Sequence, residues 1–339
     1  MDRGCQDIKM IDIYGRCGQK NLSTDTGRRL VSKIYQLVLL AVFLFFIFPI
    51  HSVLAADVVT IVEADLRPYV KALEGLNSAV KCDNITLSLQ DLIAAQKDGT
   101  NIQDTIDAYN PKVVVAIGSR CLFTIMDKVG PLPIVFTMVL NPWSLSIPKC
   151  RHITGISMNA MPDLYWKVFA DIRPVIHTIG VVYDPSKTGY LVDIAKKLAI
   201  KYHQKLIAVP VKSSTQALNA IQKMIGHIDA FWMTPDTTVY RQEVLDYLIY
   251  SSLRYHFVLA GLSVKDVNAG AMFAWSFDSY KLGNQAGKLV LAILKGDHIS
   301  DRHFFWAKGL TLSLNMRTAR KIGFSPSSSL LKTATEVIK

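Results

Sequence analysis

Short runs of β-branched apolar residues alternate along this chain with longer segments in which apolar residues recur every three or four positions. The first pattern predicts buried strands and the second predicts amphipathic helices. Strands are expected at residues 58–62, 85–89, 113–117, 133–139, 178–183, 205–211, 230–233, 257–260, 270–275 and 310–314. Helices are expected at residues 68–80, 102–109, 122–128, 190–202, 215–225, 240–255 and 279–294. Such alternation is typical of βα units around parallel sheets.

The alternation falls into two successive series with a break near residues 151–156, which predicts two similar lobes. The elements after residue 264 are too few for a third domain, so we expect them to return to both lobes and to form a hinge of several crossings. The predicted limits are 56–153 with about 265–298 for lobe 1, and 154–264 with about 299–330 for lobe 2.

An apolar run from Leu37 to Phe48 lies near the start of the chain, after the basic pair Arg28 and Arg29 and before small residues at 53–56. That order is typical of a secretory signal peptide. We therefore expect residues 1–55 to be removed and the mature protein to be periplasmic. A retained membrane anchor is the alternative, because the run with its flanks approaches the roughly 20 residues that a bilayer core requires.

Charge and cysteine content bear on partners and compartment. The net charge of the chain falls from +11 to about +8 without residues 1–55, because that segment carries seven basic and four acidic side chains. The remaining excess is spread along the chain, which predicts a solvated surface and no nucleic-acid partner. Cys82, Cys121 and Cys150 are widely spaced, so buried thiols are favoured, with a single disulfide as the alternative.

The motifs of common enzyme classes are absent from the sequence. It contains no G-x-S-x-G, no G-x-x-x-x-G-K-[ST], no H-E-x-x-H and no G-x-G-x-x-G after the first strand. The histidines are scattered, and their densest group with acidic residues, at 297–303, lies in a polar loop and is a weak metal candidate. We therefore expect neither a cofactor nor a metal.

Polar loops follow the predicted strands at residues 63–65, 118–120, 140–143, 184–187, 234–238 and 261–263. Ligands of open parallel sheets bind beyond the carboxyl ends of the strands. Any one of these loops is explained by helix capping or turn formation, which favour the same residue types. Loops that converge on one crevice predict a binding site instead.

Candidate chemistry in these loops suits a small polar ligand. Helix N-termini with Ser or Thr hydroxyls suit an anionic group, and Asp65, Asp184 or Asp236 would meet an ammonium group. Trp143, Trp232 and Trp275 lie near strand ends, where they would either stack on a flat ligand or pack in the core or at the lobe interface.

Most of residues 58–325 is covered, in order, by a series of family-like stretches. They are P-K-V-V-V-A-I-G-S at 111–119, P-I-V-F-T-M-V-L-N-P at 133–142, I-T-G-I-S at 153–157, I-G-V-V-Y-D-P-S at 179–186, I-D-A-F-W-M-T-P-D-T-T-V at 228–239, A-G-A-M-F-A-W-S at 269–276, L-G-N-Q-A-G at 282–287, I-L-K-G-D at 293–297 and L-S-L-N-M-R-T-A-R-K-I-G at 312–323. With these stretches the chain resembles the substrate-binding proteins of ABC transporters, specifically the tryptophan- or tyrosine-type periplasmic binding proteins.

The resemblance implies an α/β fold of the class I periplasmic-binding-protein type, with two Rossmann-like lobes whose parallel sheets are joined by a multi-strand hinge. It also implies no catalysis, and delivery of a small ligand to an ABC permease in the membrane. Carried over by position, the ligand-facing residues would include Ser119, Asn141, Asp184, Ser186, Asp236, Thr237 and Ser263. Asn141 and Asp184 depart from the family, which often has Asp and Asn at these two places before a proline.

We therefore expect an exported, monomeric solute-binding protein of an ABC importer that captures a small polar or amino acid-like molecule. The expected ligand-binding residues are Asp65, Ser119, Asn141, Trp143, Asp184, Ser186, Asp236, Thr237 and Ser263. One alternative is a module that reports its ligand state to a membrane sensor kinase or chemoreceptor. A second alternative is an exported α/β enzyme that uses the same crevice.

Overall fold

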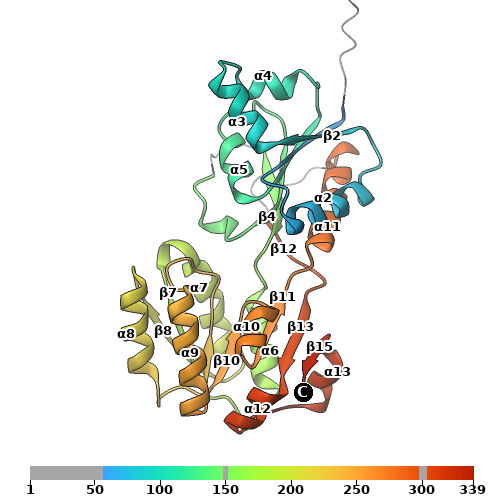
Figure 1. Ribbon diagram of the computed structural model, residues 1–339. Helices are drawn as coiled ribbons and strands as arrows, with labels where there is room; N and C mark the ends of the chain where they lie inside the picture. Colours follow the sequence, from blue (N-terminus) through green and yellow to red (C-terminus); the bar gives the residue numbers. More distant parts are fainter. Residues whose placement is uncertain (1–55, 148–151, 298–303) are drawn as a thin grey trace, which may run out of the picture. The chain divides into compact units, whose positions relative to one another are not determined.

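The computed structural model describes residues 56–147, 152–297 and 304–339 (Figure 1). The predicted signal peptide, the alternative membrane anchor and Cys150 lie outside these residues. The described strands form two large sheets, which define lobe 1 and lobe 2, and a small antiparallel pair of β6 (Ile172–Arg173) and β14 (Ser325–Pro326).

The lobe 1 sheet has the strand order β12-β5-β4-β3-β1-β2, and all its neighbouring strands are parallel. Its strands are β1 (Val58–Val62), β2 (Asn84–Ser88), β3 (Val113–Ile117), β4 (Ile134–Val139), β5 (Ile153–Ser157) and β12 (Phe304–Trp306). Every residue of β1 and β3 is buried. Central strands of a parallel sheet are covered on both faces, which explains why these two have almost wholly apolar sequences.

Helices cover both faces of the lobe 1 sheet. On one face lie α3 (Leu89–Lys97), α4 (Ile102–Asp107) and α5 (Ser119–Ile125), and on the other lie α2 (Arg67–Ala79) and α11 (Ser279–Leu294). Successive residues of a strand point to opposite faces. Val114 and Ala116 of β3 accordingly pack with the first group, whereas Val115 and Ile117 pack with the second.

The α2 and α11 helices come from distant parts of the sequence and pack closely on each other. Gly75 and Gly283 lie at their contact: a Cβ atom on Gly75 would collide with the carbonyl oxygen of Tyr280, and one on Gly283 with that of Ala72. Because only glycine lacks a Cβ atom, these residues allow the two backbones to touch. A late element of the chain therefore packs with lobe 1.

The lobe 2 sheet has the order β15-β13-β11-β10-β9-β7-β8, and β13 runs antiparallel to β11. Its strands are β7 (Thr178–Tyr183), β8 (Lys205–Pro210), β9 (Ala230–Trp232), β10 (Val258–Gly261), β11 (Phe273–Ser276), β13 (Thr311–Asn315) and β15 (Glu336–Ile338). The helices that belong with it are α6 (Pro162–Ala170), α7 (Pro185–Lys201), α8 (Ser214–Met224), α9 (Gln242–Tyr255), α10 (Val264–Ala269), α12 (Met316–Ile322) and α13 (Ser328–Thr333). The prediction of two α/β lobes with parallel-dominated sheets is confirmed.

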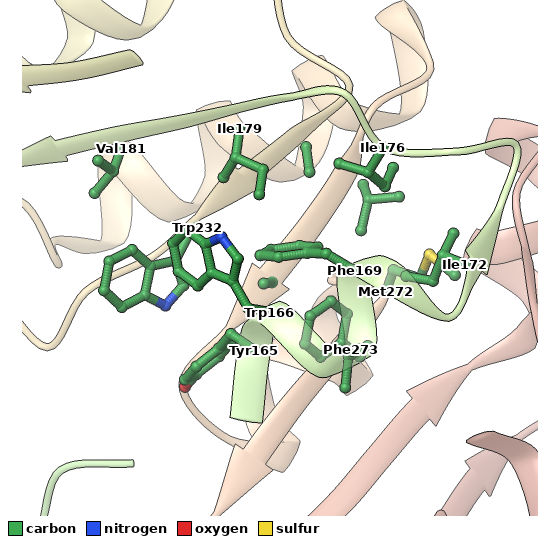
Figure 2. Packing of buried hydrophobic residues seen from close by; sticks show 14 of the residues in the cluster. Tyr165, Trp166, Phe169, Ile172, Ile176, Ile179, Val181, Trp232, Met272 and Phe273 are labelled. Carbon is green, nitrogen blue, oxygen red and sulfur yellow. The ribbon is translucent and has the colours of Figure 1, made fainter. Parts of the chain in front are cut away.

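An aromatic cluster fills one side of the lobe 2 sheet (Figure 2). Trp166 of α6 lies edge-on to Trp232 of β9, with ring centroids 5.2 Å apart, and edge-on to Phe169 at 5.8 Å. Phe169 in turn lies edge-on to Phe273 of β11 at 5.4 Å. Edge-to-face pairs of this kind add to the stabilisation that comes from burial alone.

Several elements differ from the sequence prediction. The expected break near residues 151–156 contains strand β5, whose Gly155 sits so close to Phe136 that a Cβ atom would collide with its carbonyl oxygen. The strand expected from residue 270 begins only at Phe273, because Gly270 ends α10 with a φ of +136°. Strand β12 and helix α6 were not predicted. Short or glycine-containing segments of this kind carry little periodicity.

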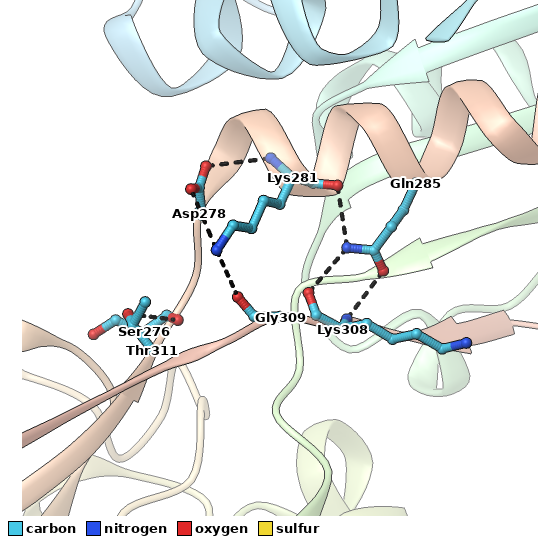
Figure 3. A network of polar contacts seen from close by, with 7 residues as sticks. All are labelled: Ser276, Asp278, Lys281, Gln285, Lys308, Gly309 and Thr311. Atoms are coloured by element: carbon cyan, nitrogen blue, oxygen red, sulfur yellow. Dashed lines mark hydrogen bonds and ion pairs between the residues drawn. The ribbon is translucent and has the colours of Figure 1, made fainter. Parts of the chain in front are cut away.

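The chain passes between the sheets after β5, after β11 and after β12. Polar contacts tie two of these crossings together (Figure 3). The side-chain amide of Gln285 donates to the carbonyl oxygen of Lys308 at 3.0 Å and accepts from its backbone N–H at 3.0 Å. Lys281 Nζ donates to the carbonyl oxygen of Gly309 at 3.4 Å. The crossings are thereby held side by side where they enter lobe 1.

The predicted residue limits of the lobes stay a prediction. Sheet membership groups β5 and β12 with lobe 1 and β11 with lobe 2. We propose lobe limits that follow these sheets, with the change of lobe at residues 158–161, 277–278 and 307–310.

Candidate ligand-binding site

A pocket of about 380 Å³ lies beyond the carboxyl ends of the lobe 2 strands. The described residues that line it are Leu140, Met158, Ala160, Tyr165, Leu191, Trp232, Pro235, Asp236, Thr237, Tyr240, Arg241, Leu262, Ser263 and Phe277. Its size lies in the range of small-molecule sites, and such sites typically combine an apolar lining with a few polar groups. Asp236, Thr237 and Ser263 are the predicted site residues that reach it.

The loops after β7 and β9 are joined by a carboxylate network. Asp236 is fully buried, and its carboxylate accepts from the backbone N–H of Asp184 at 2.7 Å, the hydroxyl of Thr188 at 2.6 Å and the backbone N–H of Thr238 at 2.9 Å. A buried carboxylate needs such donors to offset its lost hydration. Asp236 therefore shapes the loop that borders the pocket.

Asp184 and Ser186 lie at the start of α7, beside this network. The Asp184 carboxylate accepts from the backbone N–H of Ser186 at 3.0 Å, the Ser186 hydroxyl at 2.7 Å and the Thr238 hydroxyl at 2.9 Å. Partial burial by itself raises the pKa of Asp184, but the hydrogen bonds from Ser186 and Thr238 outweigh it and hold the pKa below the usual value. Asp184 is thus the N-cap of α7. Helix capping is the role that its residue type suggested as the alternative to ligand binding.

Asn141 links the end of β4 to lobe 2. Its side-chain amide donates to the carbonyl oxygen of Pro235 at 2.7 Å, and its side-chain oxygen accepts from Asn159 at 2.6 Å and from the Tyr190 hydroxyl at 3.1 Å. Its backbone is left-handed, with φ at +52°, a conformation that Asn adopts more readily than most residues. Asn141 therefore binds protein groups from both lobes.

Trp143 lies in an aromatic group next to Asn141, in the short helix η1 (Pro142–Ser144). Its ring stacks on Trp306 of β12 at 4.2 Å between centroids and lies 5.1 Å from the ring of Tyr190 of α7. Trp143 was expected either to stack on a ligand or to pack in the core, and in the structure it packs against protein rings.

Asp65 and Ser119, like Asn141 and Trp143, belong to lobe 1 and do not line this pocket. Asp65 borders a second hollow of about 290 Å³, together with Ser88 and Asp91. Ser119 is the first residue of α5, where it is partly exposed.

The start of α5 is covered by Glu63, which was not predicted. Its carboxylate accepts from the backbone N–H of Arg120 at 3.2 Å and pairs with the Tyr69 hydroxyl. A Cβ atom on Gly118, whose φ is +112°, would collide with the Glu63 carboxylate. Burial, and then the nearby Glu63, raise the pKa of the Cys121 thiol to about 12.

The loop after β10 is arranged around Asp266. Its carboxylate accepts from the backbone N–H of Leu262 at 2.7 Å and of Ser263 at 3.2 Å, and from the Tyr240 hydroxyl at 2.8 Å. Burial, and then Asp266, raise the pKa of Tyr240 to about 12, so its hydroxyl stays protonated at neutral pH. Ser263 completes a capping box with Asp266 at the start of α10.

Arg241 and Trp232 are the pocket residues whose polar groups lack protein partners. Within the described ranges, the Arg241 guanidinium forms no hydrogen bond or ion pair, and the buried Trp232 Nε1–H has no acceptor. Tyr165, Tyr240, Arg241 and Phe277 were missed by the sequence prediction. The polar loop was expected at residues 234–238 and thus ended three residues before Arg241. A longer predicted loop would have included this residue.

In the part of the chain that the structure describes, no group of three or more His, Cys, Asp or Glu side chains is placed to hold a metal ion. None of the helices within those ranges combines the length and apolar character needed to cross a membrane. Cys82 and Cys121 are both free thiols, and Cys121 is buried.

Comparison with known proteins identifies relatives of the whole described region. A family model described as ABC transporter substrate binding protein matches residues 56–338. A tyrosine-binding protein of Clostridioides difficile is 22% identical over 245 residues, which is 69% of this chain and 69% of that protein.

Solved structures share the fold at low sequence identity. The ligand-free, open structure of a substrate-binding protein with adhesive properties from Clostridium difficile has a TM-score of 0.63 and 18% identity, covering 84% of this chain and 99% of that one. An ABC domain from Streptococcus pneumonia in complex with L-Trp has a TM-score of 0.58 and 17% identity, covering 84% of this chain and 100% of that one. These likenesses show a periplasmic-binding-protein fold of two lobes.

Proposed function

Because this chain belongs to the ABC transporter substrate-binding protein family, we propose that it captures an amino acid-like ligand for an ABC importer. The family is one of binding proteins rather than enzymes. The pocket is the observation that carries the ligand class. Its lining places the aromatic residues Tyr165, Trp232, Tyr240 and Phe277 around a volume of about 380 Å³.

The lining suits an amphipathic molecule. Aromatic and aliphatic side chains favour an apolar body, and Arg241, Thr237 and Ser263 offer polar groups at the border of the same space. A buried indole N–H without an acceptor, as in Trp232, costs free energy that a ligand oxygen would recover. Relatives that carry tyrosine and tryptophan in their names fit this chemistry.

Lobe closure is the proposed step that couples binding to transport. Leu140 and Met158 follow strands of lobe 1, whereas most of the lining belongs to lobe 2. A ligand that contacts both groups binds the closed state more tightly and so shifts the population toward it. The permease would then distinguish the loaded protein from the empty one by its conformation.

Titration calorimetry tests the ligand class. The mature protein, unfolded and refolded to remove bound metabolites, is expected to bind an aromatic L-amino acid from a panel of amino acids and sugars. Ala160→Phe, which fills the pocket, is expected to weaken that binding at least about tenfold, because a ring replaces the space a ligand needs. The control Ala108→Phe places the same ring on an exposed residue far from the lining. Binding that Ala160→Phe leaves unchanged would contradict the assignment of this pocket.

We further propose that the protein acts as a periplasmic monomer after loss of residues 1–55. The basic, apolar and small-residue order of that segment supports export. N-terminal sequencing of the exported protein is expected to begin at Ala56. A mature protein that retains the segment would indicate an anchored form instead.

A further inference from the structure

Arg241 stands at a position that its own helix disfavours. It is the N-cap of α9, with no capping hydrogen bond from its side chain. Helix N-caps favour Ser, Thr, Asp or Asn, and the positive end of the helix dipole repels a cation. Arg241 is an exposed residue at the border of the pocket, and its guanidinium has no hydrogen-bond or ion-pair partner within the described residues. A residue that breaks a local rule without a compensating contact points to a role in function.

The carboxylates near Arg241 are already engaged by the protein. Asp236 accepts two backbone N–H groups and the Thr188 hydroxyl, and Asp266 accepts two backbone N–H groups and the Tyr240 hydroxyl. Neither carboxylate forms an ion pair with Arg241, which is the one cationic residue of the described pocket lining and so can pair with a ligand carboxylate.

Lobe 1 presents the opposite charge. Glu63 follows β1, and Leu140, which lines the pocket, follows β4; β3 lies between these two strands. The carboxyl ends of these strands share one edge of the sheet, and two strand spacings separate them by about 10 Å. Glu63 accepts from the Arg120 N–H in the first turn of α5, and helix N-termini of this kind were expected to suit an anionic ligand group. That place is taken by the Glu63 carboxylate, which also accepts from the Tyr69 hydroxyl. Unlike Asp236 and Asp266, Glu63 is only partly buried, so its carboxylate can also accept from a cationic ligand group.

We propose that Arg241 binds the carboxylate of the amino acid ligand and that Glu63 binds its ammonium group. This inference rests on the proposed function, in which the ligand is an amino acid. Both charged groups of an amino acid sit on one carbon atom. The two side chains therefore reach the ligand together only when the lobes close on it, which makes charge recognition part of closure. Arg241 and Glu63 would then be the residues that select a zwitterion over a simple acid or amine.

Matched ligands separate the two contacts. Wild type, Arg241→Gln and Glu63→Gln are each titrated with three ligands: L-tryptophan, tryptamine and indole-3-propionate. Tryptamine lacks the carboxylate, and indole-3-propionate lacks the ammonium group. A second set consists of L-tyrosine, tyramine and 3-(4-hydroxyphenyl)propionate. Arg241→Gln is expected to weaken the amino acid at least about tenfold and to leave the amine unchanged. Glu63→Gln is expected to weaken the amino acid similarly and to leave the deaminated acid unchanged.

Control variants remove the same charges elsewhere. Glu74→Gln changes an exposed carboxylate of α2, and Arg254→Gln changes the opposite end of α9. Both are expected to bind like wild type. Arg241→Asn supplies a second readout: as a better N-cap it is expected to raise Tm by about 2–4 °C while it weakens the amino acid. A merely structural role for Arg241 would not couple a gain in stability to a loss of binding.

The outcomes distinguish this inference from the proposed function. If wild type binds neither L-tryptophan, L-tyrosine nor any other amino acid, the ligand class is wrong and the assignment of the two residues falls with it. If wild type binds an amino acid and either variant binds it as tightly, the ligand class stands and the assignment is overturned. The assignment is also overturned if each variant binds the amino acid and both of its analogues more weakly to the same extent.

Discussion

The two lobes follow one βα plan but are filled differently. Lobe 1 has mainly aliphatic clusters, and its helices α2 and α11 meet backbone to backbone at glycines. Lobe 2 has a core in which Tyr165, Trp166, Phe169, Trp232 and Phe273 contact one another. The glycine contacts of lobe 1 fix the position of two helices. The aromatic rings of lobe 2 also fill the core, and in addition they present wide, rigid apolar surfaces that a ligand can contact.

That difference explains why the pocket is built mainly from lobe 2. Tyr165 and Trp232 belong to the aromatic core and also line the pocket, so the residues behind them fix the pocket wall. In lobe 1 the corresponding edge offers a charged side chain, Glu63, which packs against Gly118 at the start of α5. In the proposed binding mode, lobe 2 provides the apolar contacts and Arg241, and lobe 1 provides Glu63.

The largest effect is expected from Trp166→Ala. Trp166 is fully buried and supports Trp232 from behind, yet it does not line the pocket. Removal of a buried Trp side chain is expected to lower the free energy of unfolding by about 3–5 kcal/mol and to weaken ligand binding through Trp232. Guanidinium denaturation and calorimetry measure the two effects.

Tyr250→Ala is the control for Trp166→Ala, because Tyr250 is an exposed aromatic residue of lobe 2. Its unfolding free energy is expected to stay within about 0.5 kcal/mol of wild type. A loss for Trp166→Ala no larger than this would refute the supporting role of the aromatic core.

A smaller but clear effect is expected from Gly283→Ala in lobe 1. The added Cβ atom would collide with the backbone carbonyl of Ala72, so α2 and α11 must move apart. Overpacking of this kind is expected to cost about 1–3 kcal/mol or somewhat more, although Ala is the better helix former. Ligand binding in lobe 2 should change little.

Gly189→Ala is the matched control for the glycine contact. Gly189 lies within α7, and the nearest atom to an added Cβ is 3.9 Å away, on Pro185. Here Ala is expected to raise the unfolding free energy by about 0.5–1 kcal/mol, because it loses less backbone entropy in a helix. Equal effects of the two substitutions would show that close helix contact does not explain Gly283.

The fold could be predicted from sequence where one rule acts alone. β1, β3 and β7 match their predicted limits because buried strands between helical segments leave an unmistakable apolar run. The α11 helix matches as well, owing to its long amphipathic pattern. β5 was read as a break because its five residues include a glycine that only the neighbouring Phe136 carbonyl explains. Such contacts involve residues distant in sequence, and no local pattern records them.

The candidate site could be predicted as a set of loops but not as a set of side chains. Asp236, Thr237 and Ser263 line the pocket, as loops after parallel strands should. Asp184 and Asn141 stand in the right loops but bind other protein groups. Arg241 was not predicted as a binding residue. Its candidate role rests on two structural facts: α9 begins at the next residue, Gln242, and the Arg241 guanidinium has no protein partner among the described residues. The assignment of individual binding residues stays a prediction until ligands are tested.

The smallest effect is expected from Asp163→Asn, which compares charge pairs in the two lobes. Asp163, at the start of α6, lies 2.7 Å from Lys167 and 3.5 Å from Lys201 of α7, and its side chain is 16% exposed. The hydrogen bond from Lys167 is the main cause of its lowered pKa, aided by the charges of both lysines and opposed by burial. At pH 7 the substitution is expected to cost about 1 kcal/mol.

The pH dependence of this cost follows from the direction of the shift. A carboxyl group whose pKa is lower in the folded state stabilises the protein above its unfolded pKa of about 3.9 and loses that contribution as pH falls through the folded pKa. The difference between wild type and Asp163→Asn should therefore be constant from pH 7 to about 5 and shrink below about 4 in urea titrations. Asp57→Asn in lobe 1 is the control, because its partner Lys112 is 71% exposed and the pair should contribute within about 0.5 kcal/mol. A cost for Asp163→Asn that persists unchanged at pH 3 would mean that packing of the side chain, rather than its charge, joins α6 to α7.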